Sequence, residues 1–262
     1  MGKIRKLTLE EWFLDYQLDA IWNGYCHLGF NLDIDVTKLV REAADRGVHF
    51  SPTAAMIRAI GLLALEKPAT NRVLLRTLFG PRMLELDTIG VNLPVMVDNS
   101  GDPFLSGMVI KNPHERGVLE IQAEIRKYSQ GDLSDKPVGR FIKTRRNSWY
   151  NRLALRLLHF MAYRVPSLYL KFEAGGFSAS SVIRGDAEHL LNRGQAYGHT
   201  ATTFCLIGMN KTPDGRQMMM VGGGLNHSVM SGGEFQEVCS VLSRILSQGE
   251  LEDFYPELKD EK

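Results

Sequence analysis

One histidine of this chain stands where it could act as a base. His227 follows the glycines of the stretch GGGLNHSVMSGGEF and precedes a predicted helix that begins at about Ser231. A histidine has an unperturbed pKa of about 6.5, so its imidazole can take a proton from a thiol or hydroxyl near neutral pH and return it later. Two interpretations stay open: a base beside a ligand that the glycines admit, or a turn residue next to a strand bulge.

Serines on a second predicted strand could assist such a base. In GFSASSVI, Ser178 and Ser180 share one face because strand side chains alternate, and Ser181 points to the other face. From the pattern alone, these hydroxyls are polar strand side chains that face solvent. His27, on the polar side of an early strand, and His199, just before a core strand, are reserve candidates for the base.

Alternating strand and helix patterns must position these residues. The turn TPDG joins two predicted strands, ATTFCLIGMN and QMMMVGGGL, into a hairpin that carries His227 at its end. A strand with alternating apolar residues also leads into a helix near the start of the chain. The other predicted elements are helices at 7–22, 36–47, 51–67, 114–130 and 147–165, a strand within 25–36, strands within 83–110, and the helix from about Ser231 to Ser247.

Composition narrows the class of protein. With 262 residues, 44% of them hydrophobic and 23% charged, and no clear linker, the chain is expected to form a single domain over 1–262. The 31 Lys and Arg residues against 30 acids give no signal for nucleic-acid binding. No apolar run approaches the roughly 18 residues of a membrane-spanning helix, so we expect a soluble or at most peripheral protein. The scattered cysteines favour a cytoplasmic location.

Several kinds of site are not supported by the sequence. Cys26, Cys205 and Cys239 lack the spacing of a zinc site or a disulfide framework, which favours a reducing compartment and argues against a metal cofactor. The chain also has no Walker A loop, no G-x-S-x-G elbow and no H-E-x-x-H motif. Nucleotide, hydrolase and zinc-enzyme interpretations are therefore not favoured.

A resemblance to a known family joins these observations. The stretch from His227 to Gly232 resembles the His-x-x-x-Asp-Gly motif of the chloramphenicol acetyltransferase-like, coenzyme A-dependent acyltransferases, especially the catalytic domains of dihydrolipoyl acyltransferases. DIDVTKLVREAADRGVHFSPTAAMIRAIGLLALEKPATN is similar to another family segment, with Pro68 and Asn71 in matching places. IGVNLPVMVDNSGDPFLSGMVI is similar to the family's hairpin, and GEFQEVCSVLSRIL to its closing helix. About 200 residues are covered.

The resemblance implies a fold and a reaction. It implies an α/β two-layer sandwich, a mixed sheet with helices on one face and a small extra sheet, without a lipoyl domain. It also implies a homotrimer in which His227 of one subunit faces Ser180 of its neighbour. His227 would be the general base and Ser180 the oxyanion donor for transfer of an acyl group from a coenzyme A or acyl-carrier-protein thioester to a hydroxyl, amine or thiol. Coenzyme A would be a cosubstrate rather than a bound cofactor, and no metal is implied.

The chain departs from the family pattern at two positions. Ser231 stands where the family has an aspartate, which there pairs with an arginine and holds the histidine loop. Asn226 stands where relatives often have a second histidine or an aspartate. Ser231 and Glu234 have the spacing of a capping box, which could fix the start of the last helix instead. The departure keeps an alternative open, a non-catalytic trimeric scaffold or binding protein with the same fold.

A basic segment offers a possible contact surface. Between Arg140 and Lys171 the chain has eight lysines and arginines and no acid, interleaved with large apolar residues such as Trp149 and Leu153. The pattern indicates an amphipathic helix that docks on the core by its apolar face. The alternatives are contact with an anionic membrane surface, a carrier protein or the phosphates of coenzyme A.

Overall fold

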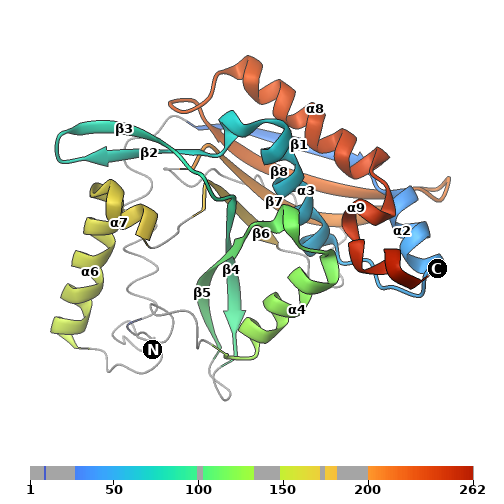
Figure 1. Cartoon of the computed structure of the whole chain (residues 1–262), viewed down its shortest axis with the longest axis horizontal. Coiled ribbons are helices and arrows are strands. Elements are labelled where there is room, and N and C mark those ends of the chain that lie inside the picture. Colours follow the sequence, from blue (N-terminus) through green and yellow to red (C-terminus); the bar gives the residue numbers. More distant parts are fainter. Residues whose placement is uncertain are drawn as a thin grey trace, which may run out of the picture.

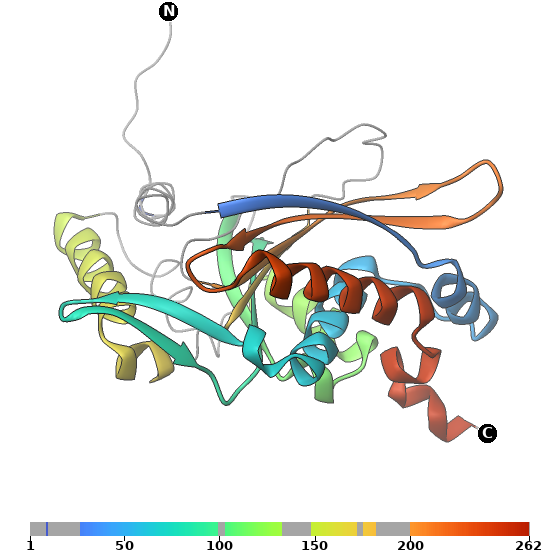
Figure 2. The same cartoon turned by 90° about the horizontal axis from the view of Figure 1, so that it is seen from above.

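The computed structural model describes Leu9 and residues 27–98, 103–132, 148–171, 175–181 and 200–261. A six-stranded mixed sheet lies over a layer of helices, and a separate two-stranded ribbon projects from one side (Figures 1 and 2). The predicted α/β class, with helices on one face of a mixed sheet and a small extra sheet, is confirmed. The helix predicted at 7–22 lies, except for Leu9, outside the described residues.

The six-stranded sheet has the order β1-β8-β7-β6-β4-β5. Its pairs are antiparallel except β4 with β6 and β6 with β7, which are parallel. The strands are β1 (His27–Asp35), β4 (Gly90–Val97), β5 (Phe104–Lys111), β6 (Phe177–Ser181), β7 (Thr202–Lys211) and β8 (Gln217–Asn226), and the ribbon consists of β2 (Arg72–Thr77) and β3 (Gly80–Glu85).

Helices α3, α4 and α8 form a layer beneath this sheet, with α3 between α4 and α8, whereas α6 and α7 lie beside the ribbon (Figure 2). Pro52 begins α3 after the N-cap residue Ser51, and most of this helix is buried, as its apolar composition predicts. The helices are α2 (Thr37–Asp45), α3 (Pro52–Glu66), α4 (Val118–Ser129), α6 (Trp149–Arg164), α7 (Pro166–Lys171), α8 (Gly232–Gln248) and α9 (Leu251–Phe254), with 3-10 turns at Pro68–Thr70, Pro113–Glu115 and Pro256–Glu261.

The hairpin that was predicted to carry His227 is present as β7 and β8. Its turn is closed by hydrogen bonds from Thr212 N to Arg216 O at 2.9 Å and from Gly215 N to Thr212 O at 2.9 Å. Gly215 has φ of 88°, a left-handed conformation that favours glycine. The turn fixes the register of the two strands, and β8 then ends at Asn226, directly before His227.

The sequence pattern did not predict the ribbon of β2 and β3, because it indicated strands only from Met83 onward. It has a small core of its own, in which Val73 and Leu75 pack with Tyr169 of α7. Asn71 anchors its base, because Nδ2 of this buried residue donates to the oxygens of Leu86 at 2.8 Å and Thr88 at 3.1 Å. Pro68 and Asn71, which match the family segment in sequence, therefore lie directly before the ribbon.

Candidate active site

His227 projects from the turn between β8 and α8 and is exposed to solvent. Its Nδ1 lies 3.2 Å from the carbonyl oxygen of Met230. A carbonyl oxygen can only accept a hydrogen bond, so Nδ1 carries the hydrogen and the neutral ring keeps its lone pair on Nε2. The contact therefore selects the tautomer in which Nε2 can remove a proton from a bound molecule.

Asn226 shapes the turn that holds this histidine. It is fully buried, and its backbone oxygen accepts from Val229 N at 2.9 Å and from Met230 N at 3.1 Å. Its side-chain Oδ1 accepts from Ser228 N at 3.0 Å. Val229 and Met230 are buried in the main core. The short turn is thus fixed on both sides of His227, and Asn226 serves as a support for the loop.

Ser231 and Glu234 form the predicted capping box at the start of α8. Ser231 Oγ accepts from Glu234 N at 3.3 Å, and Glu234 Oε2 accepts from Ser231 N at 2.8 Å. The other carboxylate oxygen, Oε1, lies 3.2 Å from Nη2 of Arg72, at the start of β2. A carboxylate paired with an arginine is therefore present beside the histidine loop, supplied three positions after the family's aspartate.

Loss of this cap should weaken the start of α8. We expect Ser231→Ala to lower the free energy of unfolding by about 1 kcal/mol, whereas Ser231→Asp, also a good N-cap residue, should leave it nearly unchanged. Urea denaturation followed by circular dichroism measures both variants. An equal loss in the two variants would mean that the hydroxyl matters for another reason.

The pH dependence of stability tests how much the Glu234 carboxylate contributes to this capping box. Hydrogen bonds from the backbone N–H and the hydroxyl of Ser231 hold the pKa of Glu234 below its usual value of 4.5. A lowered pKa in the folded state adds stability above pH 4.5, and that stability is lost as the pH falls through the folded-state pKa. Glu234→Gln should therefore reduce stability at pH 7, and the difference from wild type should shrink below pH 4.5.

The glycines before His227 lie in regular strand, without a bulge in their register. A Cβ on Gly223 would overlap the backbone oxygen of Thr203 and the ring of Phe30. Phe30 also packs on Phe235 of α8, at 4.9 Å between ring centroids. Gly223 therefore faces the helix layer and admits an aromatic side chain, which is a structural role.

Gly222 and Gly224 face the opposite way. They pair in register with Cys205 and Thr203 of β7, which in turn pair with Ser180 and Ser178 of β6. Residues paired in register point to the same face of a sheet, so these two glycines place no side chain on the face that carries the serines. The interpretation that glycines admit a ligand is compatible with Gly222 and Gly224, although not with Gly223.

Substitution of Gly223 should be costly for the whole domain. We expect Gly223→Ala to destabilise the protein by about 2 kcal/mol, because the new methyl group would force apart β7, β8 and the Phe30 ring. The free energy of unfolding in urea measures this effect. Gly107→Ala is a matched control, since a Cβ on that strand glycine would have no atom within 4 Å; an equal loss there would refute the packing argument.

Three serines on β6 differ in surroundings. Thr53 Oγ1 of α3 donates to Ser181 Oγ at 3.0 Å, which places Ser181 on the helix side of the sheet. By alternation Ser178 and Ser180 point away from the helices. Ser178 is buried and Ser180 half-buried. Burial raises the pKa of the Cys205 thiol, and a hydrogen bond with Ser180 opposes that rise, so this hydroxyl lies beside the cross-strand thiol.

Ser180 and His227 are not neighbours within one chain. Ser180 is level with Gly222 of β8, two strands away, and His227 lies five residues after Gly222, just beyond the end of β8. Strand geometry gives a separation of roughly 17 Å along the strands and about 10 Å across them. One chain alone therefore does not bring the two predicted catalytic residues together.

The structure does not describe the side chains of the two reserve histidines. His199 and the side chain of His27 lie outside the described residues, although the His27 backbone pairs with Asn226. His159 of α6 is buried against Tyr163, and burial lowers its pKa to about 4. Within the described ranges, no cluster of three or more His, Cys, Asp or Glu side chains could bind a metal ion.

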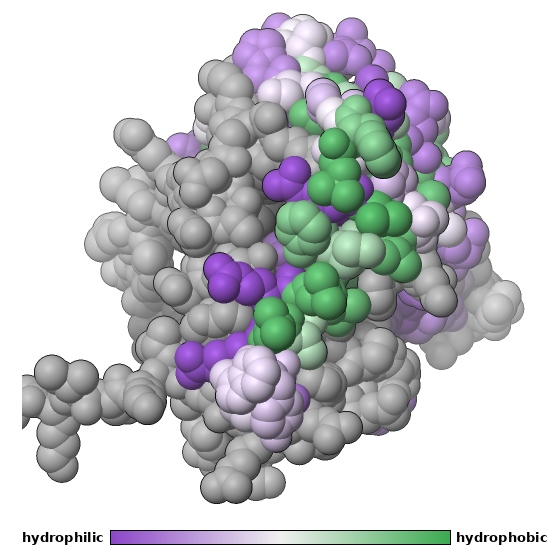
Figure 3. All heavy atoms as spheres, turned by 90° about the vertical axis from the view of Figure 1, so that its left-hand side faces the viewer, coloured by the Kyte–Doolittle hydropathy of each residue, from purple (hydrophilic) through white to green (hydrophobic). Residues whose placement is uncertain are grey.

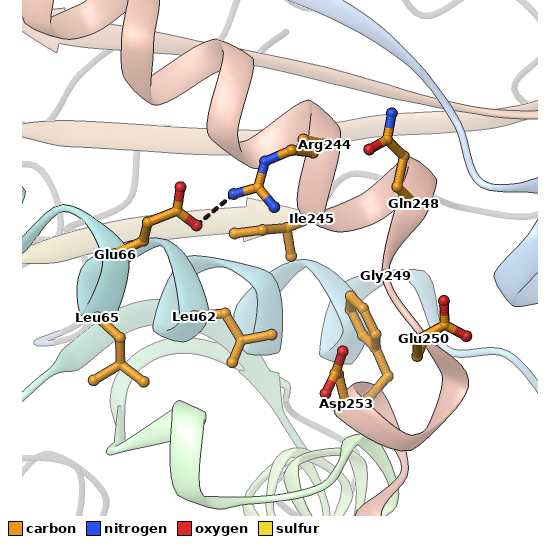
Figure 4. A pocket seen from close by; sticks show the side chains of 10 residues that line it. Leu62, Leu65, Glu66, Arg244, Ile245, Gln248, Gly249, Glu250 and Asp253 are labelled. Carbon is orange, nitrogen blue, oxygen red and sulfur yellow. Dashed lines mark hydrogen bonds and ion pairs between the residues drawn. The ribbon is translucent and has the colours of Figure 1, made fainter.

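An open pocket of about 560 Å³ lies elsewhere, between α3 and the junction of α8 with α9 (Figure 4). Glu66, Glu250 and Asp253 line it, and Glu66 is ion-paired with Arg244. This pocket is at the far end of α8 from Ser231, roughly 20 Å along the helix axis. It is therefore separate from the histidine loop.

Known proteins share this fold at low sequence identity. No protein-family model and no curated protein sequence matches the chain. Among solved structures, the dihydrolipoamide acetyltransferase of Azotobacter vinelandii matches with a TM-score of 0.65 and 15% identity, over 97% of this chain and 94% of that one. That study concerns the role of a serine, a histidine and an asparagine in the catalytic mechanism, the asparagine being four positions after the histidine.

Two further structures extend the match. A truncated catalytic core of the 2-oxoacid dehydrogenase multienzyme complex from Thermoplasma acidophilum has a TM-score of 0.65 and 15% identity, over 95% of this chain and 100% of that one. A chloramphenicol acetyltransferase has a TM-score of 0.50 and 13% identity, over 94% and 100%. The chain thus has the fold of the coenzyme A-dependent acyltransferases, as the sequence resemblance implied.

Proposed function

We propose that this protein is an acyltransferase that moves an acyl group from a coenzyme A or carrier-protein thioester to a hydroxyl, amine or thiol acceptor. The observation that carries the proposal is the His227 ring, an exposed side chain whose Nδ1 contacts Met230 O, so that the lone pair of the neutral ring lies on Nε2. The fold supports the same reaction class, because the Azotobacter and chloramphenicol enzymes of similar structure are acetyltransferases.

In the proposed reaction, Nε2 of His227 removes the proton of the acceptor as the acceptor attacks the thioester carbonyl carbon. The carbonyl oxygen becomes an oxyanion, and the Ser180 hydroxyl donates a hydrogen bond to it. The carbon–sulfur bond then breaks, and the thiolate takes the proton back from the imidazolium. General base catalysis contributes typically 10²- to 10⁴-fold, and one oxyanion donor about 3 kcal/mol.

A complete site requires two copies of the chain. Because Ser180 and His227 lie roughly 20 Å apart in one chain, Ser180 of a second copy must approach His227 of the first. Such a contact joins two different surfaces, and contacts of this kind form a ring where the rotation between copies closes and an open filament where it does not. We propose a homotrimer with three equivalent sites, in line with the multimeric core from which one similar structure comes.

The alternative is a non-catalytic scaffold that keeps the fold. The observation in its favour is Ser231 at the aspartate position of the family motif. The Glu234 carboxylate, paired with Arg72, stabilises the end of the histidine loop at which the family has its aspartate. The absence of that aspartate is therefore weaker support for the scaffold.

Thiol release from a panel of acyl-coenzyme A thioesters, with mixed small acceptors, tests the proposal. Turnover by the wild-type protein should be acceptor-dependent and should identify the preferred acyl chain. The same panel loaded on acyl carrier protein tests the second donor. If neither donor supports turnover by the assembled protein, the enzyme proposal is wrong and the scaffold takes its place.

A further inference from the structure

Helix α6 has its large apolar residues on the outside. The residues it buries are Asn151, Leu155 and His159, four positions apart on one face. Trp149, Leu153, Leu157 and Phe160 lie on the other face, where Trp149 is 76% and Leu157 59% exposed. The sequence pattern predicted that the apolar side docks on the core, and that interpretation is wrong: α6 packs on the ribbon by its narrower, partly polar face.

The tip of the ribbon adds exposed apolar side chains to the same side of the molecule. Thr77 Oγ1 donates to Gly80 O at 2.6 Å and accepts from Phe79 N at 3.2 Å, and Gly80 has φ of 96°. This turn leaves Leu78 and Phe79 projecting, with Phe79 88% exposed. Figures 1 and 2 show the tip beside α6 and α7, and Figure 3 shows an apolar band there, bordered by hydrophilic residues.

We define the lateral patch as the four exposed residues of α6 together with the two of the ribbon tip. Soluble monomers rarely expose a contiguous apolar patch of more than a few hundred Å², and larger ones mark binding surfaces. This patch combines an indole, two phenyl rings and three leucines on two elements. It therefore needs a partner with an apolar component.

Charge identifies the kind of partner. The segment from Arg140 to Lys171 contains eight cationic residues and no acid, while the remaining chain has 23 cationic residues against 30 acids, a net charge of −7. On α6, Arg156 is exposed, and the Arg164 guanidinium lies 5.5 Å from the centre of the Phe160 ring. Apolar side chains bordered by arginine are typical of helices that lie in the interface of an anionic bilayer.

We propose that the lateral patch docks this protein on the surface of an anionic lipid bilayer. The exposed face of α6 lies in the plane of the membrane, about 24 Å long for its 16 residues, and the ribbon tip inserts beside it. The acidic remainder of the chain is repelled by the same surface, which fixes the orientation of docking. No helix among the described residues could cross a membrane, so contact through these elements is peripheral.

A two-fold contact between copies suits the patch less well, and a head-to-tail contact between copies is distinguished from lipid docking by the molar mass of the patch variant. Such a two-fold contact would bring Arg156 and Arg164 of two α6 helices to the same interface, where like charges repel. An anionic lipid surface instead attracts the positive charge of the arginines and accepts the apolar side chains. The proposal does not depend on acyl transfer, because docking is measured without turnover.

Co-sedimentation of the full chain with vesicles tests the proposal. The protein should pellet with vesicles of phosphatidylglycerol mixed with phosphatidylcholine and stay in solution with pure phosphatidylcholine. Leu153→Ser with Leu157→Ser should reduce the partition coefficient at least tenfold. Arg156→Gln with Arg164→Gln should reduce it about 30-fold at low salt, since each arginine near an anionic leaflet contributes to binding.

Leu65→Ser is the matched control, because Leu65 is 54% exposed on α3, near the pocket of Figure 4 and outside the patch. It should bind vesicles like the wild type. The proposal is overturned if anionic vesicles do not pellet the protein, or if the double-leucine variant pellets normally. It is also overturned if that variant changes the molar mass in ultracentrifugation, since the patch would then be an interface between copies.

Discussion

Replacing His227 with alanine should lower kcat for thioester turnover by about 10³-fold while leaving folding and assembly intact. The loss follows from removal of the general base, whose contribution is typically 10²- to 10⁴-fold. Folding should hardly change, because the ring is exposed and makes its described hydrogen bond to one carbonyl, Met230 O. Steady-state kinetics, together with thermal unfolding and ultracentrifugation, measure the two effects separately.

His227→Asn is the informative companion variant. Its amide can still donate to the turn, yet it has no titratable nitrogen, so it should be as inactive as the alanine variant. If alanine inactivates and asparagine does not, the imidazole positions the loop and some other group removes the proton. If both variants keep full turnover, the reaction does not use His227.

The periodicity of the sequence was sufficient for the sheet and its helices. Alternation predicted β1, and the turn residues up to Gly215 predicted the β7–β8 hairpin and where it reverses. The nearly all-apolar composition of α3 predicted a buried helix, and the Ser231–Glu234 spacing predicted the cap of α8. These features depend on residues close together in the chain, which is why pattern alone could show them.

The ribbon and α6 show where such patterns fail. Most of β3 is exposed on both faces, so its residues do not alternate between apolar and polar as a half-buried strand does. In α6 the periodicity marks an apolar face but does not say that this face is turned to the core. That depends on the ribbon against which α6 packs, through residues such as Val73 and Tyr163.

The candidate site was predicted only in part, because it depends on contacts between residues far apart in the chain. Arg72 and Glu234 are in contact although they lie 162 positions apart in the chain, and no local spacing of residues predicts this contact. The resemblance named His227 and Ser180 as partners, and only the strand register shows how far apart they are in one chain. The shared site of two copies is therefore the part of the proposal that most needs an independent test.

Mixing two inactive variants should restore activity if the site is shared between copies. Ser180→Ala, which removes the oxyanion donor, should lower kcat by at least about 10²-fold. In trimers assembled at random from equal amounts of Ser180→Ala and His227→Ala chains, one contact in about four joins an intact His227 to an intact Ser180. The mixture, unfolded and refolded together, should thus recover about a quarter of wild-type turnover.

The double variant, Ser180→Ala with His227→Ala, separates restored sites from any other effect of mixing. Refolded with either single variant, it can form no complete site, so turnover should stay at the level of the single variants. Mass spectrometry of the intact assemblies verifies that the chains have exchanged. If exchanged assemblies of the two single variants remain inactive, Ser180 and His227 do not act together across an interface, and the oxyanion donor must be sought nearer to the histidine loop of the same chain.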